Sequence, residues 1–83
     1  MKHIIRFTAN WCSPCKVYAP TFERVASEIP GMKFETIDVD SADPRIIEYG
    51  IRGVPTTVVL ENGNVIRKQS GNMSEIQLKE LIK

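Results

Sequence analysis

Two cysteines separated by two residues are the part of this sequence best suited to covalent chemistry. Cys12 and Cys15 are the only cysteines among 83 residues, with Ser13 and Pro14 between them. A cysteine at a helix N-terminus faces unpaired backbone N–H groups and the positive end of the helix dipole, and both stabilise a thiolate. The thiolate is the nucleophile of disulfide exchange. We therefore assign Cys12 as the attacking thiol and Cys15, one helical turn later, as the resolving thiol.

The segments around the pair predict a strand followed by a helix. Residues 4–9 are rich in β-branched and aromatic types, which favours a strand. Residues 13–29 carry apolar side chains on one helical face, and Pro14 fits the first turn, where its missing N–H costs nothing. A Cys-x-x-Cys between a strand and a helix is typical of a redox site.

The rest of the chain predicts three more strands. They lie at 33–39, 56–60 and 65–69, and the turn Asn62-Gly63 joins the last two as a two-residue hairpin. The element order is βαβαββα. It indicates an α/β fold with a four-stranded mixed sheet flanked by three helices.

Two further helices are expected from capping signals. Ser41 or Asp43 can cap a short helix, with Pro44 at its first position and Gly50 just beyond its end. A capping box of the form Asn72-x-x-Glu75 predicts the start of the last helix.

Bulk properties place limits on the partners. The chain length suits one domain, residues 1–83, and the hydrophobic content of 42% is ordinary for a globular protein. A net charge of +1 gives no reason to expect nucleic acid or a membrane as partner. Arg6 interrupts the apolar start, so there is no signal-peptide core. We expect a monomer in the reducing cytoplasm, where paired cysteines are more often catalytic or metal-binding than structural.

A metal site is the alternative use of the cysteines. Zinc takes about four ligands, and the chain offers only Cys12, Cys15 and His3. Completing the site would need a carboxylate or a second copy of the chain, so we predict no metal and interpret His3 as an ordinary residue at a strand start. A structural disulfide across so short a loop would restrict the unfolded chain little.

Several blocks of the sequence resemble the thioredoxin family. Residues 9–16 read Ala-Asn-Trp-Cys-Ser-Pro-Cys-Lys, like the family's active-site motif, and Ala19-Pro20 matches the family's proline within the helix. The likeness returns at residues 49–56 (Tyr-Gly-Ile-Arg-Gly-Val-Pro-Thr), and then at Asn62-Gly63 and Gly71. Because the blocks keep their order and spacing, the resemblance implies a thioredoxin-like fold and a thiol–disulfide oxidoreductase.

The resemblance also implies roles for residues near the cysteines. Pro55 would be a cis-proline facing the disulfide, and the Val54 backbone would pair with an extended substrate segment. Trp11, Pro14, Val54, Pro55 and Gly71 would form an apolar docking surface. The alternatives are a partly buried core position for Trp11 and a simple turn before the last helix for Gly71.

The sequence departs from the family at several positions. The family's first strand and helix are absent, so strand 33–39 would become a sheet edge. Ser13 replaces a glycine, which can tune the reduction potential. Lys16 adds diffuse positive potential or is simply solvated.

Arg6 occupies the place of the family's buried aspartate, and Thr36 occupies that of its lysine partner. Arginine cannot act as a base near neutral pH. One hypothesis is that Arg6 favours the Cys15 thiolate; the alternative is an arginine that reaches the surface.

The electron donor is inferred from the same comparison. Glutaredoxins bind glutathione partly through a Gly-Gly-x-x-Asp-type turn, whereas residues 70–74 read Ser-Gly-Asn-Met-Ser. We therefore expect no bound cofactor, electrons from NADPH through a thioredoxin reductase, and disulfide-containing proteins as substrates. The alternatives are a glutaredoxin-like protein reduced by glutathione and a redox-silent binding module that uses the apolar patch around Trp11.

Overall fold

The first strand leads directly into the helix that carries the two cysteines. A computed structural model describes all residues, 1–83. The elements in chain order are β1 (Lys2–Thr8), α1 (Ser13–Glu28), β2 (Lys33–Asp38), α2 (Arg45–Glu48), β3 (Thr56–Glu61), β4 (Asn64–Ser70) and α3 (Glu75–Ile82). The predicted order βαβαββα is confirmed, with boundaries that differ by one or two residues.

The four strands form the predicted mixed sheet, in the order β2-β1-β3-β4. β1 pairs in parallel with β2 and antiparallel with β3, which also pairs antiparallel with β4. The expectation that residues 33–39 form an edge is confirmed, since β2 has β1 as its only neighbour. The ends of β1 and β2 and the start of β3 therefore meet at one end of the sheet.

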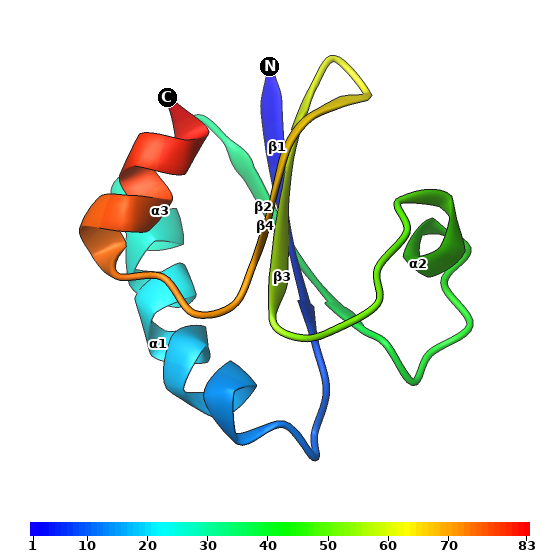
Figure 1. Cartoon of the computed structure of the whole chain (residues 1–83). Coiled ribbons are helices and arrows are strands. Elements are labelled where there is room, and N and C mark those ends of the chain that lie inside the picture. Colours follow the sequence, from blue (N-terminus) through cyan, green and yellow to red (C-terminus); the bar gives the residue numbers. More distant parts are fainter.

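Helices cover both faces of the sheet. α1 and α3 lie together on one face and α2 lies on the other (Figure 1). Successive side chains of β1 alternate between these faces, as in any strand. Ile4 packs with α1 and α3, whereas Ile5 and Phe7 pack on the α2 side. None of the helices is both long and apolar enough to cross a membrane.

The turn between β3 and β4 forms as the sequence predicts. Asn62 has a φ of 52° and Gly63 a φ of 86°. Two successive positive φ values match the twist of the flanking strands, and asparagine followed by glycine tolerates them best. Glu61 and Asn64 close the ladder on either side of the turn.

The start of α3 differs from the prediction. The capping box is made by Ser74 and Gln77, not by Asn72 and Glu75. The Ser74 hydroxyl accepts from the Gln77 backbone N–H at 3.2 Å, and the Gln77 side chain accepts from the Ser74 N–H at 2.8 Å. Met73, the residue before this cap, joins Leu78 in the core, which is the hydrophobic staple that fixes the entry of a helix. Burial of Met73 selects the later of two similar sequence signals.

The short helix α2 begins one residue later than predicted. Pro44 occupies its N-cap rather than its first helical position. Of the two predicted capping residues, Asp43 is the one that meets the helix, because its carboxylate accepts from the Arg45 backbone N–H at 2.9 Å. Gly50 follows the helix with a φ of 65°, as predicted for the position beyond the end.

Ion pairs join α2 to the edge strand. The Arg45 guanidinium donates to both carboxylate oxygens of Glu35, at 3.0 and 2.6 Å, and to Asp43 at 2.8 and 3.0 Å. His3 Nε2 lies 2.8 Å from the same Glu35 carboxylate. These contacts hold a helix of four residues, which has no buried residue of its own, against β2.

The Arg45 contacts predict a stability loss in acid. Hydrogen bonds from Arg45 lower the pKa of Asp43 from 3.8 to about 2 and also lower the pKa of Glu35. Folded pKa values below the unfolded ones mean that the unfolded chain binds more protons in this range, so stability falls as pH drops from about 5 toward 2. We expect the urea midpoint of Arg45→Gln to fall less over this range than that of the parent.

The matched control is Arg24→Gln, because Arg24 forms only an exposed ion pair with Glu75 at 3.8 Å. This variant should keep the acid dependence of the parent. If the urea midpoints of the parent and of Arg45→Gln fall in parallel as the pH drops, the Arg45 contacts do not cause the loss of stability in acid.

Candidate active site

The loop between β1 and α1 places Cys12 at the N-cap of the helix. Cys12 has extended backbone angles, φ −99° and ψ 106°, and its N–H donates to the Ala9 carbonyl at 3.2 Å. Its Sγ accepts from the Cys15 backbone N–H at 3.2 Å. Pro14 lies in the first turn, where no N–H is needed. The sulfur therefore occupies the place that a capping oxygen takes in other helices.

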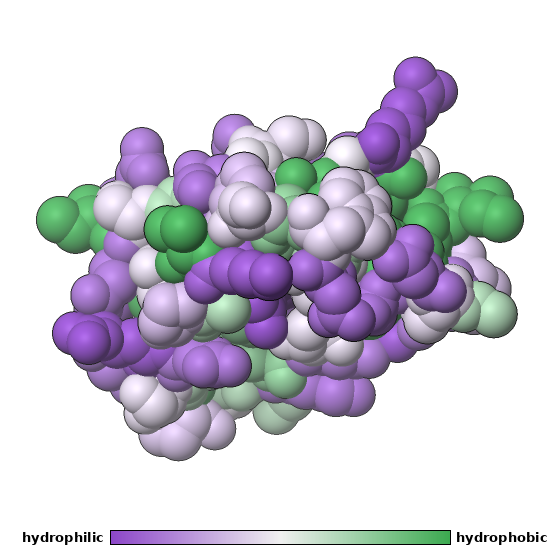
Figure 2. Space-filling model, turned by 90° about the horizontal axis from the view of Figure 1, so that it is seen from below, coloured by the Kyte–Doolittle hydropathy of each residue, from purple (hydrophilic) through white to green (hydrophobic).

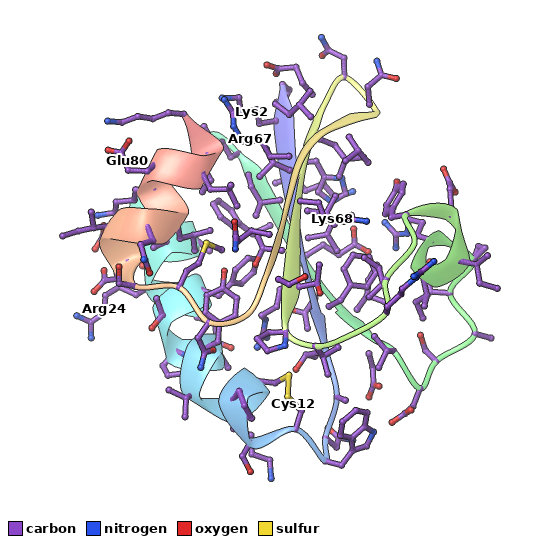
Figure 3. All side chains as sticks on the ribbon, in the orientation of Figure 1. Lys2, Cys12, Arg24, Arg67, Lys68 and Glu80 are labelled. Atoms are coloured by element: carbon purple, nitrogen blue, oxygen red, sulfur yellow. A yellow bond between two sulfur atoms is a disulfide. The ribbon has the colours of Figure 1, made fainter.

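Cys12 and Cys15 form a disulfide, with 5.3 Å between their Cα atoms. The two residues are 5% and 1% exposed, so Cys15 is the deeper of the pair. They pack with Ala9, Val39 and Val54. Figure 3 shows the sulfur atoms at the start of α1, at the end of the sheet opposite the chain termini. The resolving sulfur is thus shielded from solvent by the attacking one and its neighbours.

A second loop, between α2 and β3, faces the disulfide. The Val54–Pro55 peptide bond is cis, as the resemblance implied, and the Val54 carbonyl oxygen lies 3.7 Å from Cys12 Sγ. Thr56 Oγ1 donates to the Gly53 carbonyl at 2.7 Å, and the Gly71 N–H donates to the Pro55 carbonyl at 2.8 Å. Contacts from β3 and from the end of β4 therefore fix this loop on both sides.

An apolar hollow lies beside the disulfide. Its volume is about 230 Å³, and Trp11, Val39, Ile46, Ile51 and Val54 are its apolar lining residues. Only Trp11 and Val54 of this set were predicted as site residues. Val39 and Ile46 come from other parts of the chain that the fold brings together, and Ile51 lies in the same loop as Val54. Figure 2, which views this end of the molecule, shows apolar patches interrupted by hydrophilic side chains.

Trp11 is an exposed aromatic at the edge of this hollow. It is 68% exposed, and its indole Nε1 donates to Asp40 Oδ2 at 2.9 Å. The structure therefore places Trp11 on the surface and not in the core. Asp40 follows β2 and fixes the orientation of the indole; no signal in the sequence predicted this contact.

The remaining residues predicted near the cysteines differ in exposure, and Pro55 is buried. Ser13, Pro14 and Lys16 are all exposed on the first turn of α1. The sulfur contacts are with Cys15 and Val54, so Ser13 has no part in them. Gly71 is half-buried, with a φ of 90° that suits glycine.

Arg6 is buried beneath α1. It is 7% exposed, which does not fit the alternative of an arginine that reaches the surface. Its Nη2 donates to Thr36 Oγ1 at 3.0 Å, and its guanidinium carbon lies 5.3 Å from the centre of the Phe22 ring. Its Nε has no hydrogen-bond partner. Desolvation lowers the pKa of Arg6, and the negative charge of Glu23 partly offsets this by raising it.

A tyrosine hydroxyl lies in the same layer. The Tyr18 hydroxyl and Thr57 Oγ1 are 2.8 Å apart, and both residues are almost fully buried. Burial raises the pKa of Tyr18, while the Thr57 hydrogen bond and the Arg6 charge lower it to a smaller extent. The helical periodicity indicated Tyr18 as a core residue but gave no sign of this polar partner.

Comparison with known proteins identifies the family. The thioredoxin family model matches residues 1–83. The thioredoxin of Mycoplasmoides gallisepticum is 40% identical over 82 residues, which span 99% of this chain and 82% of that protein. The chain belongs to the thioredoxin family. The thioredoxin of Haemophilus influenzae is 34% identical over 80 residues, which cover 95% of this chain and 75% of that one.

Solved thioredoxin structures match the fold over the same length. The Fasciola hepatica thioredoxin superposes with a TM-score of 0.90 at 34% identity, covering 98% of this chain and 77% of that one. The oxidised Plasmodium falciparum thioredoxin gives 0.86 at 33% identity, with 98% and 77% coverage. The predicted thioredoxin-like fold is therefore confirmed.

Family membership and the Cys12–Cys15 pair make this protein a thiol–disulfide oxidoreductase. Thioredoxins carry no bound cofactor, and the redox group here is the cysteine pair itself. No group of three or more His, Cys, Asp or Glu side chains is arranged to hold a metal ion.

The Trp11–Asp40 hydrogen bond gives a direct optical prediction. Trp11 is the only tryptophan of the chain, so the tryptophan fluorescence comes from this side chain alone. We expect Asp40→Ala to lower the fluorescence anisotropy of Trp11, because the freed indole samples more orientations. The free energy of unfolding should change by less than about 1 kcal/mol, since the hydrogen bond is exposed.

The control is Glu61→Ala, which removes a carboxylate at the far end of β3. An unchanged anisotropy in Asp40→Ala would mean that packing against the loop, and not Asp40, orients the indole.

Proposed function

We propose that this thioredoxin is a cytoplasmic reductase of protein disulfides that is recharged by a thioredoxin reductase. The observation that carries the proposal is the position of Cys12 Sγ, which accepts the Cys15 N–H at the N-cap of α1 and lies beside the Val54 carbonyl. An N–H donor and the helix dipole stabilise a sulfur anion there. The arrangement favours Cys12 as the nucleophile of the reduced protein.

The first step joins the protein to its substrate. The Cys12 thiolate attacks one sulfur of the substrate disulfide, forming a Cys12–substrate bond and breaking the substrate S–S bond. The other substrate sulfur leaves as a thiolate and takes a proton from solvent. Cys12 is 5% exposed, so only a small part of the residue is open to an approaching substrate sulfur.

The second step releases the product. Cys15 gives its proton to water, and its thiolate attacks Cys12 Sγ, so that the Cys12–Cys15 bond forms, the Cys12–substrate bond breaks and the second substrate thiolate departs. Two electrons have then passed from the cysteine pair to the substrate. The separation of 5.3 Å between the Cα atoms lies within the range that a disulfide requires.

The segment around Val54 supports strand-like docking of substrates. The Val54 backbone N–H and C=O form no backbone–backbone hydrogen bond within the chain, so both are free to pair with an extended segment. We also assign to substrate contact Trp11, which lines the hollow beside Val54, together with Pro14, Pro55 and Gly71. Ser13 and Lys16 act as exposed neighbours of the sulfur atoms.

The cellular setting forms part of the same proposal. We place residues 1–83 as one monomeric domain in the cytoplasm, where reducing conditions keep the dithiol available. The electrons come from NADPH through a flavoprotein thioredoxin reductase, and the partners are that reductase and disulfide-containing proteins. The absence of a Gly-Gly-x-x-Asp-type turn in residues 70–74 supports this donor over glutathione.

The cysteine variants test the proposed order of attack. We expect Cys12→Ser to lower the rate of protein-disulfide reduction by more than about a thousandfold, because it removes the nucleophile. Cys15→Ser should instead accumulate a mixed disulfide between Cys12 and the substrate. Mass spectrometry of the trapped complex and a reductase assay with NADPH provide the measurements.

The same assay separates the alternatives. Reduction by glutathione but not by reductase and NADPH would favour the glutaredoxin-like function. A Cys12→Ser, Cys15→Ser double variant that keeps full biological activity would favour a binding module. Trapping through Cys15 in place of Cys12 would contradict the assigned roles.

We propose in addition that the buried Arg6 charge favours the Cys15 thiolate. The Arg6 guanidinium lies against Phe22 on the helix that carries Cys15, and a buried cation stabilises the anionic, reduced form through space. Removing it should therefore make the reduction potential more negative. We expect Arg6→Met to lower the potential of the pair by about 10–30 mV and to raise the pH at which the Cys15 thiol ionises. Redox equilibration with glutathione and pH-dependent alkylation measure the two quantities.

Arg6→Lys is the matched control, because it keeps the charge while changing the shape. It should restore most of the parent potential. The methionine side chain retains apolar packing on Phe22, so a folded Arg6→Met protein with an unchanged potential would rule out the electrostatic role.

A further inference from the structure

A polar pocket lies on the α2 side of β4, next to the loop that faces the disulfide. Its volume is about 420 Å³, and it contains one apolar lining residue, Ile51. The other lining residues are Gly50, Arg52, Gly53, Thr56, Lys68 and Ser70. Two cations and no carboxylate therefore surround the pocket.

Both cations are free to meet a ligand. Lys68 Nζ donates to the Tyr49 carbonyl at 3.0 Å, which fixes the ammonium group near the pocket and leaves its other protons available. Arg52 is exposed, and neither residue takes part in any of the chain's ion pairs. An unpaired arginine and an unpaired lysine facing one hollow suit a carboxylate.

The pocket is continuous with the proposed docking surface. Ile51, Arg52 and Gly53 line both this pocket and the apolar hollow that contains Trp11 and Val54. Residues 51–53 thus form a ridge with an apolar hollow on one side and a cationic pocket on the other. An extended chain advances about 3.3 Å per residue, so a segment paired with Val54 reaches the ridge within a few residues.

We propose that the pocket binds an acidic side chain of the protein substrate, a few residues from the disulfide being reduced. The proposal deepens the proposed function and rests on it, because it adds a substrate preference to the same site. Arg52 supplies a planar fork that matches a carboxylate, and Lys68 supplies a point charge. Protein disulfides flanked by aspartate or glutamate are thereby favoured over neutral ones.

Matched variants test the preference. Lys68 pairs with Val58 and Arg67 with Val59, so the two cations leave β4 on opposite faces, Lys68 toward α2 (Figure 3). The test protein is Arg52→Gln, Lys68→Gln, and the control is Arg24→Gln, Arg67→Gln, which removes the same charge from the opposite side. The pre-reduced proteins react with two disulfide peptides that differ only in acidic or neutral flanking residues, and stopped-flow fluorescence of Trp11 gives the second-order rate constants.

The expected result is selective. The ratio of the acidic-peptide rate constant to the neutral-peptide rate constant should fall about tenfold in the test protein and less than about twofold in the control, so that any general loss of docking through Arg52 cancels. Added salt should lower the acidic-peptide rate of the parent and of the control, which both keep Arg52 and Lys68, more than that of the test protein. Equal rates for both peptides with the parent, or equal losses in test and control proteins, would overturn the proposal.

A binding measurement keeps this inference separate from the proposed function. An acidic peptide without cysteines is titrated into the oxidised protein, and backbone amide shifts are followed by NMR. Shifts confined to Gly53, Ser70 and their neighbours, and lost in Arg52→Gln, Lys68→Gln, support the pocket even if reduction fails. Shifts that persist in that variant would overturn it.

Discussion

The hydrogen bond from the Cys15 backbone N–H to Cys12 Sγ is the contact on which the site depends. It requires Cys12 to be extended and the next residues to be helical, so it exists only where α1 begins. The same turn brings the two Cα atoms within 5.3 Å of each other. One piece of local geometry therefore stabilises a sulfur anion and provides the partner that resolves the mixed disulfide.

The sheet brings a second segment to this helix start. β1 and β3 run antiparallel, so the end of β1 and the start of β3 lie at one edge, and the loops before α1 and before β3 become neighbours. Gly71, which follows β4, donates its N–H to the Pro55 carbonyl and so fixes the loop before β3. Segments far apart in sequence thus define the approach to Cys12, and the pairing register fixes how they meet.

The layer beneath α1 contains a buried charged side chain, Arg6, in a small core that is otherwise largely apolar. Arg6 is buried on the Phe22 ring and shares one hydrogen bond with Thr36, while its Nε lacks a partner. Desolvation lowers its pKa, but an arginine remains protonated near neutral pH. Because a buried charge acts through a medium of low polarity, its influence on neighbouring groups exceeds that of a surface cation.

Local sequence signals determined the elements, the Asn62-Gly63 turn and the place of the cysteine pair, because period, turn chemistry and capping act over a few residues. The predicted start of α3 was wrong, because two capping signals lie two residues apart in the sequence and only the burial of Met73 decides between them. The apolar hollow, the Trp11–Asp40 contact and the Arg52–Lys68 pocket were decided by tertiary structure alone. Each joins residues from separate elements, and only the pairing of strands and the packing of helices sets the distances between them.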